Sequence, residues 1–213
     1  MDECCDRSSY DDTFDDRFAR RQARRYRRRG LNGTQEQMVA FLSERGLEGA
    51  SVLEIGGGVG ELHVELLRRG AGQVTNTEIS PNYETEAAEL LGRSGMTGRV
   101  TRQFVDIAAA PQDVPEADVV VLHRVVCCYP DYERLLSAAG GHARRMLVFS
   151  HPPGGPLTRG MTRFDNALRR LRGNDFRTFA HSPAKMVATL QQQGLTPTFR
   201  HRGWSWHVVG LER

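Results

Sequence analysis

Acidic side chains stand at the ends of three successive apolar segments, where they could bind the polar groups of a ligand. The acids are Glu54, Glu78 and Asp106, and each segment has the length and apolar content of a short buried strand. In an open α/β sheet, ligands bind beyond the carboxyl ends of the strands. A carboxylate there can accept hydrogen bonds from two hydroxyl groups at once. The alternative is that each acid is only solvated at a strand end, but three of them beside a glycine turn favour a ligand site.

A glycine-rich turn follows the first of these strands and precedes an expected helix over 61–70. Gly56, Gly58 and Gly60 have no Cβ atoms, so a ligand can approach the backbone and the helix N-terminus closely. The dinucleotide fingerprint G-x-G-x-x-G/A does not fit, because Glu61 stands where its third small residue is needed. The Lys-Ser/Thr pair of a P-loop is also missing. The turn therefore indicates a nucleotide-like ligand of another class.

The pattern E-x-G-x-G-x-G over residues 54–60, with acids at the next two strand ends, resembles the motifs of class I S-adenosylmethionine (SAM)-dependent methyltransferases. The resemblance covers about residues 34–213 and implies SAM as the cofactor. It implies that the glycines lie against the methionine part, that Glu78 binds the ribose, and that Asp106 contacts the adenine amine, with two isoleucines flanking the ring. The implied cofactor-binding residues are Glu54, Gly56, Gly58, Gly60, Glu78, Ile79, Asp106, Ile107 and His123.

Strand-like and helix-like segments alternate along the chain, which predicts a Rossmann-like, doubly wound α/β fold. The last two strands are joined only by residues 202–204, so they must be antiparallel, because a parallel crossover needs about a dozen residues. The resemblance implies seven strands, mostly parallel, with an antiparallel last strand. We expect strands at 52–55, 73–79, 100–105, 117–122, 145–149, 196–201 and 205–211. We expect helices from Thr34 (with Gln37 completing a capping box), at 61–70, 82–91, 131–139, 164–172 and 184–193, and an irregular loop over 152–160.

We divide the chain into an N-terminal helical cap segment, 1–33, and a methyltransferase domain, 34–213. Acids precede a run of arginines at 17–29, as the helix dipole favours for a helix that starts near Asp12. An amphipathic helix with solvated arginines is favoured over a nucleic-acid site. We expect the acceptor pocket to be built from the N-terminal segment and residues 151–182.

Length and composition are those of one α/β domain, with 213 residues, 39% hydrophobic and 26% charged. An apolar run long enough to span a bilayer and a signal peptide are both missing from the sequence, so we expect a cytoplasmic protein that binds no membrane. The net charge of +3 is modest. These features favour a small-molecule acceptor over nucleic acid, and either a monomer or a homodimer.

Two histidines follow expected strands and are candidates for the acceptor side. His123 follows the strand at 117–122, and His151 follows the strand at 145–149. Either could contact the acceptor or act as a general base, although a packed histidine bonded to a loop carbonyl is an equal alternative for His123. The Tyr-Pro-Asp sequence at 129–131 resembles the magnesium-protoporphyrin O-methyltransferase branch. Cys128 stands where that branch carries a histidine, so it is a third candidate and a departure from the pattern.

The cysteines occur as two adjacent pairs, Cys4-Cys5 and Cys127-Cys128. Neither pair has the C-x-x-C spacing of a zinc site, so we assign no metal and expect reduced thiols. If the N-terminal segment folds over the pocket, four thiols could instead converge to bind a soft metal or a metalloid.

The leading hypothesis is a SAM-dependent methyltransferase that acts on a small molecule, with O-methylation favoured. Three alternatives remain: a nucleotide-cofactor oxidoreductase, a regulatory module that binds SAM or a nucleoside without catalysis, and a thiol- or metalloid-directed methyltransferase that uses the paired cysteines. The misplaced Glu61 argues against the first of these.

Overall fold

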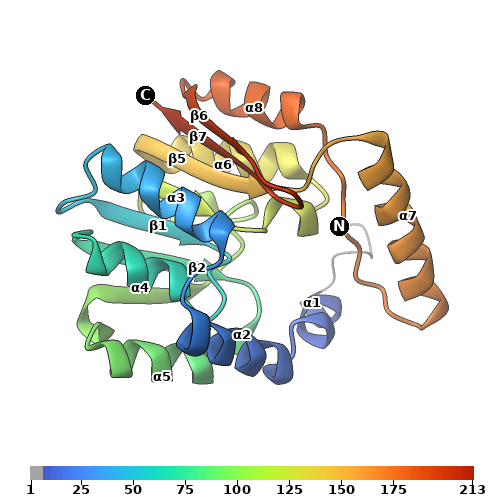
Figure 1. The fold of residues 1–213 in the computed structure, drawn as a ribbon, viewed down its shortest axis with the longest axis horizontal. Helices are drawn as coiled ribbons and strands as arrows, with labels where there is room; N and C mark the ends of the chain where they lie inside the picture. The colour runs from blue at the N-terminus through green and yellow to red at the C-terminus, as the bar shows by residue number, and fades with distance from the viewer. Residues whose placement is uncertain (1–6) are drawn as a thin grey trace.

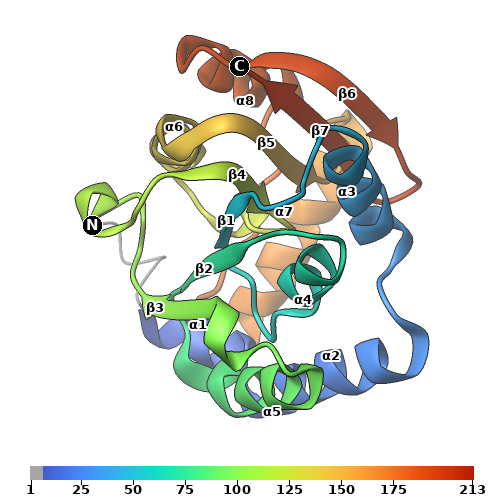
Figure 2. The ribbon, with the colours of Figure 1, turned by 90° about the vertical axis from the view of Figure 1, so that its left-hand side faces the viewer.

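The central sheet has seven strands in the order β3-β2-β1-β4-β5-β7-β6 (Figures 1 and 2). The structure, a computed structural model, describes residues 7–213. Strands β1 to β5 run parallel, whereas β7 is antiparallel to both of its neighbours, β5 and β6. The strands are β1 (Ser51–Ile55), β2 (Gln73–Glu78), β3 (Val100–Phe104), β4 (Ala117–Leu122), β5 (Ala143–His151), β6 (Thr196–Arg202) and β7 (His207–Glu212). The predicted Rossmann-like fold class and the antiparallel ending are confirmed.

Eight α-helices accompany the sheet among the described residues. They are α1 (Arg7–Thr13), α2 (Asp16–Arg29), α3 (Gly33–Glu44), α4 (Glu61–Arg68), α5 (Glu84–Ser94), α6 (Tyr132–His142), α7 (Pro156–Leu171) and α8 (Pro183–Gln192). Figure 2 shows α6 on one face of the sheet and α3 and α4 on the other. None of the helices in residues 7–213 combines the length and apolar content needed to cross a bilayer.

The central strands are apolar on both faces because helices cover both. Leu53 and Val120 lie in the core cluster that α6 and α8 complete, whereas Val52 and Val121 lie in the cluster that α3 and α4 complete. Successive residues of β1 therefore alternate between two cores. The position of Glu54 follows from this alternation, because it shares a face with Val52.

Several helix starts differ from the predictions. The N-cap of α3 is Asn32, and Gln35 completes the capping box, two residues before the predicted Thr34 and Gln37. An asparagine accepts from the first free N–H groups as well as a threonine does, so the earlier cap is used. The predicted loop to residue 160 is shorter, because α7 already begins at Pro156, a residue suited to the first helical position.

The N-terminal segment folds as two helices rather than one. Asp15 separates them and caps α2, accepting from the Phe18 N–H at 2.7 Å. Ala19 and Ala23 of α2 pack with Val59 and Tyr83 of the domain. The short side chains let α2 approach the glycine turn closely. Whether residues 1–33 form a separate unit stays a prediction.

Two glycine substitutions test the packing of α3 on β7. A Cβ at Gly210 of β7 would lie 2.5 Å from the ring of buried Phe41 on α3, whereas a Cβ at Gly92 of α5 would meet nothing within 4 Å. We expect Gly210→Ala to lower the free energy of unfolding by about 1–3 kcal/mol through overpacking. Gly92→Ala should raise it by up to about 1 kcal/mol, because the unfolded chain loses freedom. Urea unfolding measures both, and equal effects of the two substitutions would contradict this packing.

Candidate functional site

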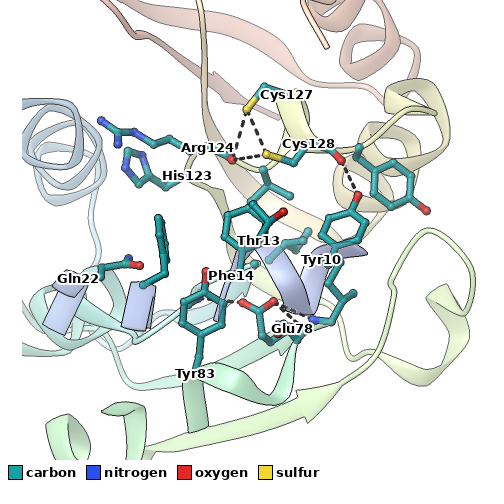
Figure 3. A pocket seen from close by; sticks show the side chains of 18 of the residues that line it. Tyr10, Thr13, Phe14, Gln22, Glu78, Tyr83, His123, Arg124, Cys127 and Cys128 are labelled. Carbon is teal, nitrogen blue, oxygen red and sulfur yellow. Dashed lines mark hydrogen bonds between the residues drawn. The ribbon is translucent and has the colours of Figure 1, made fainter. Parts of the chain in front are cut away.

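A cavity of about 670 Å³ opens at the carboxyl ends of the parallel strands. This volume is within the range of small-molecule sites, about 300–1,000 Å³. Its floor comes from the glycine turn and the residues that follow β2, β3 and β4, and its cover comes from α1 and α2. Figure 3 shows the side chains that converge there.

Gly56 and Gly58 line this cavity, and their φ angles of 65° and 58° are ones that glycine adopts readily. A Cβ at Gly56 would lie 2.7 Å from Val125, so this position also needs glycine for packing. Gly60 does not line the cavity. It has a φ of 88°, and a Cβ there would lie 2.3 Å from the ring of His63 on α4.

Glu54 does not reach the cavity either. Its buried Oε2 lies 2.5 Å from Nδ1 of His63, which is fully buried on α4. This bond joins the first strand to the helix that follows the turn. The alternation of β1 could have placed Glu54 on the face of α4, but the prediction relied on its position near the strand end and on the resemblance of the E-x-G-x-G-x-G pattern. We therefore do not propose that Glu54 binds the cofactor directly.

Glu78 and Asp106 lie on the same cavity, together with Ile79 and Ile107. Oε2 of Glu78 accepts from the Gly58 N–H at 3.0 Å, and Oε1 accepts from the Ile79 N–H at 2.8 Å. Burial raises the pKa of Glu78, and the backbone donors oppose this rise. The acids at the ends of β2 and β3 thus converge on one cavity beside the glycine turn, as predicted.

Asp106 is held by two donors. Oδ1 accepts from the Ala108 N–H at 2.9 Å, and Oδ2 accepts from the Tyr129 hydroxyl at 2.8 Å. Burial and the bond to Asp106 raise the pKa of Tyr129, so this hydroxyl remains a donor at neutral pH. The Asp106 carboxylate is therefore oriented before a ligand binds.

Three polar atoms on the cavity lining are buried without a hydrogen-bond partner: Thr13 Oγ1, Glu61 Oε2 and Thr77 Oγ1. Oε1 of Glu61 accepts from the amides of Gln22 and Gln35, at 2.8 and 2.9 Å. Burial raises the pKa of Glu61. A buried polar group without a partner is costly, so these atoms indicate where a ligand supplies the missing bonds. In the sequence Glu61 appeared only as a misfit to another motif.

His123 lines the cavity, and its Nδ1 lies 3.1 Å from Oγ of Ser150 (Figure 3). Burial first, then the charges of Arg124 and Arg25, lower the pKa of His123 to about 3. The ring is therefore neutral at physiological pH. His151 is not on the lining: it is buried, and its Nδ1 donates to the Pro152 carbonyl at 2.8 Å.

Cys127 and Cys128 both line the cavity, with their sulfur atoms 3.6 Å apart. The bond between the thiols lowers the pKa of Cys127 and, together with burial, raises that of Cys128. Cys128 is thus the thiol that keeps its proton. Cys4 and Cys5 lie outside the described residues. Within residues 7–213 no three His, Cys, Asp or Glu side chains are grouped to hold a metal ion.

The N-terminal helices and the segment before α8 meet above the cavity. The Tyr10 hydroxyl donates to the Cys128 carbonyl, and the Phe14 ring packs edge-on against Phe176 at 5.3 Å between centroids. Residues from 10–32 and 169–178 line the cavity, in line with the expected contributors to the acceptor pocket.

Comparisons with known proteins agree with this geometry. A family model described as "Methyltransferase domain" matches residues 19–203. The fold is similar to magnesium protoporphyrin IX methyltransferase from Synechocystis PCC 6803 with bound SAH (S-adenosylhomocysteine), with 22% identity, a TM-score of 0.76, and coverage of 98% of this chain and 100% of that one. An O-methyltransferase family protein from Burkholderia thailandensis has 17% identity, a TM-score of 0.67, and coverage of 84% and 56%. No curated protein matches the chain by sequence.

The low pKa of His123 predicts a pH dependence of stability. The unfolded imidazole has a pKa of about 6.5, so between pH 6.5 and about 3 the unfolded state binds more protons. The contribution of His123 to the free energy of unfolding is complete above pH 6.5 and is lost as the pH falls. From pH 7 to 5.5, we expect the free energy of unfolding to fall by about 1 kcal/mol more in the wild type than in His123→Gln. Urea unfolding at both pH values measures this difference.

His201→Gln, on β6 and away from the cavity, is the control for the loss of an imidazole. The prediction fails if His123→Gln and the wild type lose stability in parallel.

Proposed function

The chain belongs to the methyltransferase-domain family and is a SAM-dependent methyltransferase, and we propose that it methylates an oxygen atom of a small molecule. One observation carries the proposal: Glu78 and Asp106 converge on one cavity beside the glycine turn, where Glu61 and Thr77 hold buried polar atoms without partners. A ligand with hydroxyl, amino and ammonium groups would satisfy them.

The residues present fit the cofactor. We propose that Gly56 and Gly58 lie against its methionine part and that the free oxygen of Glu61 accepts from its ammonium group. Glu78 would accept from the ribose hydroxyls. Asp106, oriented by Tyr129, would accept from the adenine amine, and the ring would lie between Ile79 and Ile107. When bound, SAM supplies a methyl group that its sulfonium has already activated.

The chain's own contribution is to place the acceptor and exclude water. Phe14, Phe18 and Tyr83 supply an apolar cover over the glycine turn, which favours a reaction in which charge is dispersed. His123 is neutral and can hydrogen-bond the acceptor. With a pKa of about 3 it is a weak base, because an efficient general base has a pKa near the working pH. We therefore propose that the accepting oxygen is ionised readily without help, as in a phenol or a carboxylic acid.

The acceptor is proposed to be small because α1 and α2 cover the cavity. Related folds include the magnesium protoporphyrin IX methyltransferase named above. They also include an O-methyltransferase family 2 protein from Planctomyces limnophilus in complex with apigenin, at 19% identity, a TM-score of 0.65, and coverage of 92% of this chain and 61% of that one. Cys128 continues to set this chain apart from the porphyrin branch.

We also propose a cytoplasmic location, with a monomer or homodimer as the functional form and no nucleic-acid partner. The oxidoreductase, regulatory and thiol-directed alternatives are less well supported, although Cys127 and Cys128 both line the cavity.

Three variants test whether Asp106 lies on the cofactor side of the cavity and His123 on the acceptor side. Asp106→Ala should weaken binding of SAH, the demethylated product, at least tenfold, because a charge-assisted bond contributes about 1.5–3 kcal/mol. His123→Ala should leave SAH affinity within about twofold and lower kcat, because His123 is on the acceptor side. Asp113→Ala is the control, since Asp113 is exposed and does not line the cavity. Calorimetry measures SAH binding, and an SAH-release assay over a panel of acceptors measures turnover.

The assignment is wrong if Asp106→Ala binds SAH as tightly as Asp113→Ala. It is also wrong if His123→Ala loses SAH binding while Asp106→Ala retains it.

A further inference from the structure

Arginines line the part of the cavity that the cofactor-binding residues do not use. They are Arg21, Arg25, Arg124 and Arg169. Arg169 forms an ion pair with Asp165 at 2.8 Å. Among the described residues, no carboxylate lies within ion-pair distance of Arg25 or Arg124. Arg25 and Arg124 are both exposed to solvent, and they line the cavity without a carboxylate partner in residues 7–213.

Arg124 is held in place by an unusual backbone conformation. Its φ of 60° is the one positive value at a non-glycine residue in 7–213. Such a conformation costs roughly 1–3 kcal/mol and persists only where the surroundings impose it, often at functional sites. The Arg124 N–H donates to Ser150 Oγ at 2.9 Å, and the guanidinium carbon lies 4.7 Å from the ring centroid of Trp206. Figure 3 shows Arg124 extending beside His123.

The two arginines repel each other. Burial and the charge of Arg25 lower the pKa of Arg124, and the charges of both arginines add to the effect of burial in lowering the pKa of His123. The carboxylates of the cavity do not form ion pairs with them, because Glu61 is bonded to two amides, Glu78 to backbone N–H groups, and Asp106 to Tyr129. An anion between Arg25 and Arg124 would relieve this repulsion.

The strand order places Arg124 and Trp206 on the opposite side of β1 from Glu78 and Asp106. Glu78 and Asp106 follow β2 and β3, on one side of β1. Arg124 follows β4, and Trp206 directly precedes β7, on the other side. The Trp206 ring offers a flat apolar surface beside the charge. The site therefore suits the acceptor better than the cofactor.

We propose that Arg124, together with Arg25, binds an anionic group of the methyl acceptor, of the carboxylate or sulfonate type, on a flat apolar body that packs near Trp206. This inference rests on the proposed function, because it names the acceptor class for the same cavity. The carboxylate of the cofactor's methionine part has the same chemistry, so the test must separate the two sources.

A matched pair of fluorescent probes supplies the test. 1-Anilinonaphthalene-8-sulfonate is flat, apolar and anionic, whereas N-phenyl-1-naphthylamine is its neutral counterpart without the sulfonate. We expect the full chain to bind the sulfonate more tightly than the neutral probe. Arg124→Gln and Arg25→Gln should each weaken sulfonate binding about tenfold, as expected for the loss of one charge-assisted bond, and change neutral-probe binding by less than twofold.

Arg124→Lys and Arg28→Gln are the controls. Arg124→Lys keeps the charge and should lose less than Arg124→Gln, although it cannot stack on Trp206 in the same way. Arg28 is exposed on α2, one turn beyond Arg25, and does not line the cavity, so Arg28→Gln should bind both probes as the wild type does. The proposal is overturned if the wild type does not prefer the sulfonate, or if Arg124→Gln weakens both probes equally.

SAH affinity, measured on the same variants, identifies the source of the anion. We expect Arg124→Gln to bind SAH within about twofold of the wild type. If SAH binding falls about tenfold while sulfonate binding is unchanged, the arginines bind the cofactor's carboxylate and the proposal is wrong. If the wild type binds no SAH but discriminates between the probes through Arg124, the anion site stands and the proposed function fails.

Discussion

The hydrogen bond from the Gly58 N–H to the Glu78 carboxylate connects the two parts of the chain on which the cavity depends. It fixes the glycine turn after β1 against the end of β2. The other oxygen of the same carboxylate accepts from the Ile79 N–H, so a backbone N–H group fixes each of the two oxygens. A buried carboxylate is stable only with such donors. Burial raises the pKa of Glu78, and the hydrogen bonds from the backbone oppose that rise.

The cavity divides electrostatically along the sheet. Oriented carboxylates lie at the ends of β2 and β3, whereas Arg124 follows β4 and lies beside Trp206, which precedes β7. His123 stands beside Arg124, and its pKa is lowered first by burial and then by the charges of Arg124 and Arg25. In the proposed arrangement Glu61 would meet the cofactor's ammonium group and Arg124 would meet an anionic acceptor, so each ligand would meet a group of opposite charge.

Sequence patterns were sufficient for the sheet and for placing Glu78 and Asp106 on one cavity, because these depend on local strand length and on position at a strand end. They were not sufficient for Glu54, whose direction depends on which face of β1 the following helix covers. His151 is the last residue of β5, so it does stand at a strand end, but its side chain is buried away from the cavity lining. No local sequence pattern identified Arg124 or Glu61. Their importance depends on which hydrogen-bond and ion-pair partners lie near them in the folded chain.

The aromatic contact of Phe14 with Phe176 joins segments more than 150 residues apart above the cavity. Tyr10 reinforces it, with its ring 5.5 Å from Phe176 and its hydroxyl on the Cys128 carbonyl. The cluster ties the N-terminal helices to the segment before α8, so the two parts of the chain that line the cavity from outside the sheet are fixed to each other as well as to the sheet.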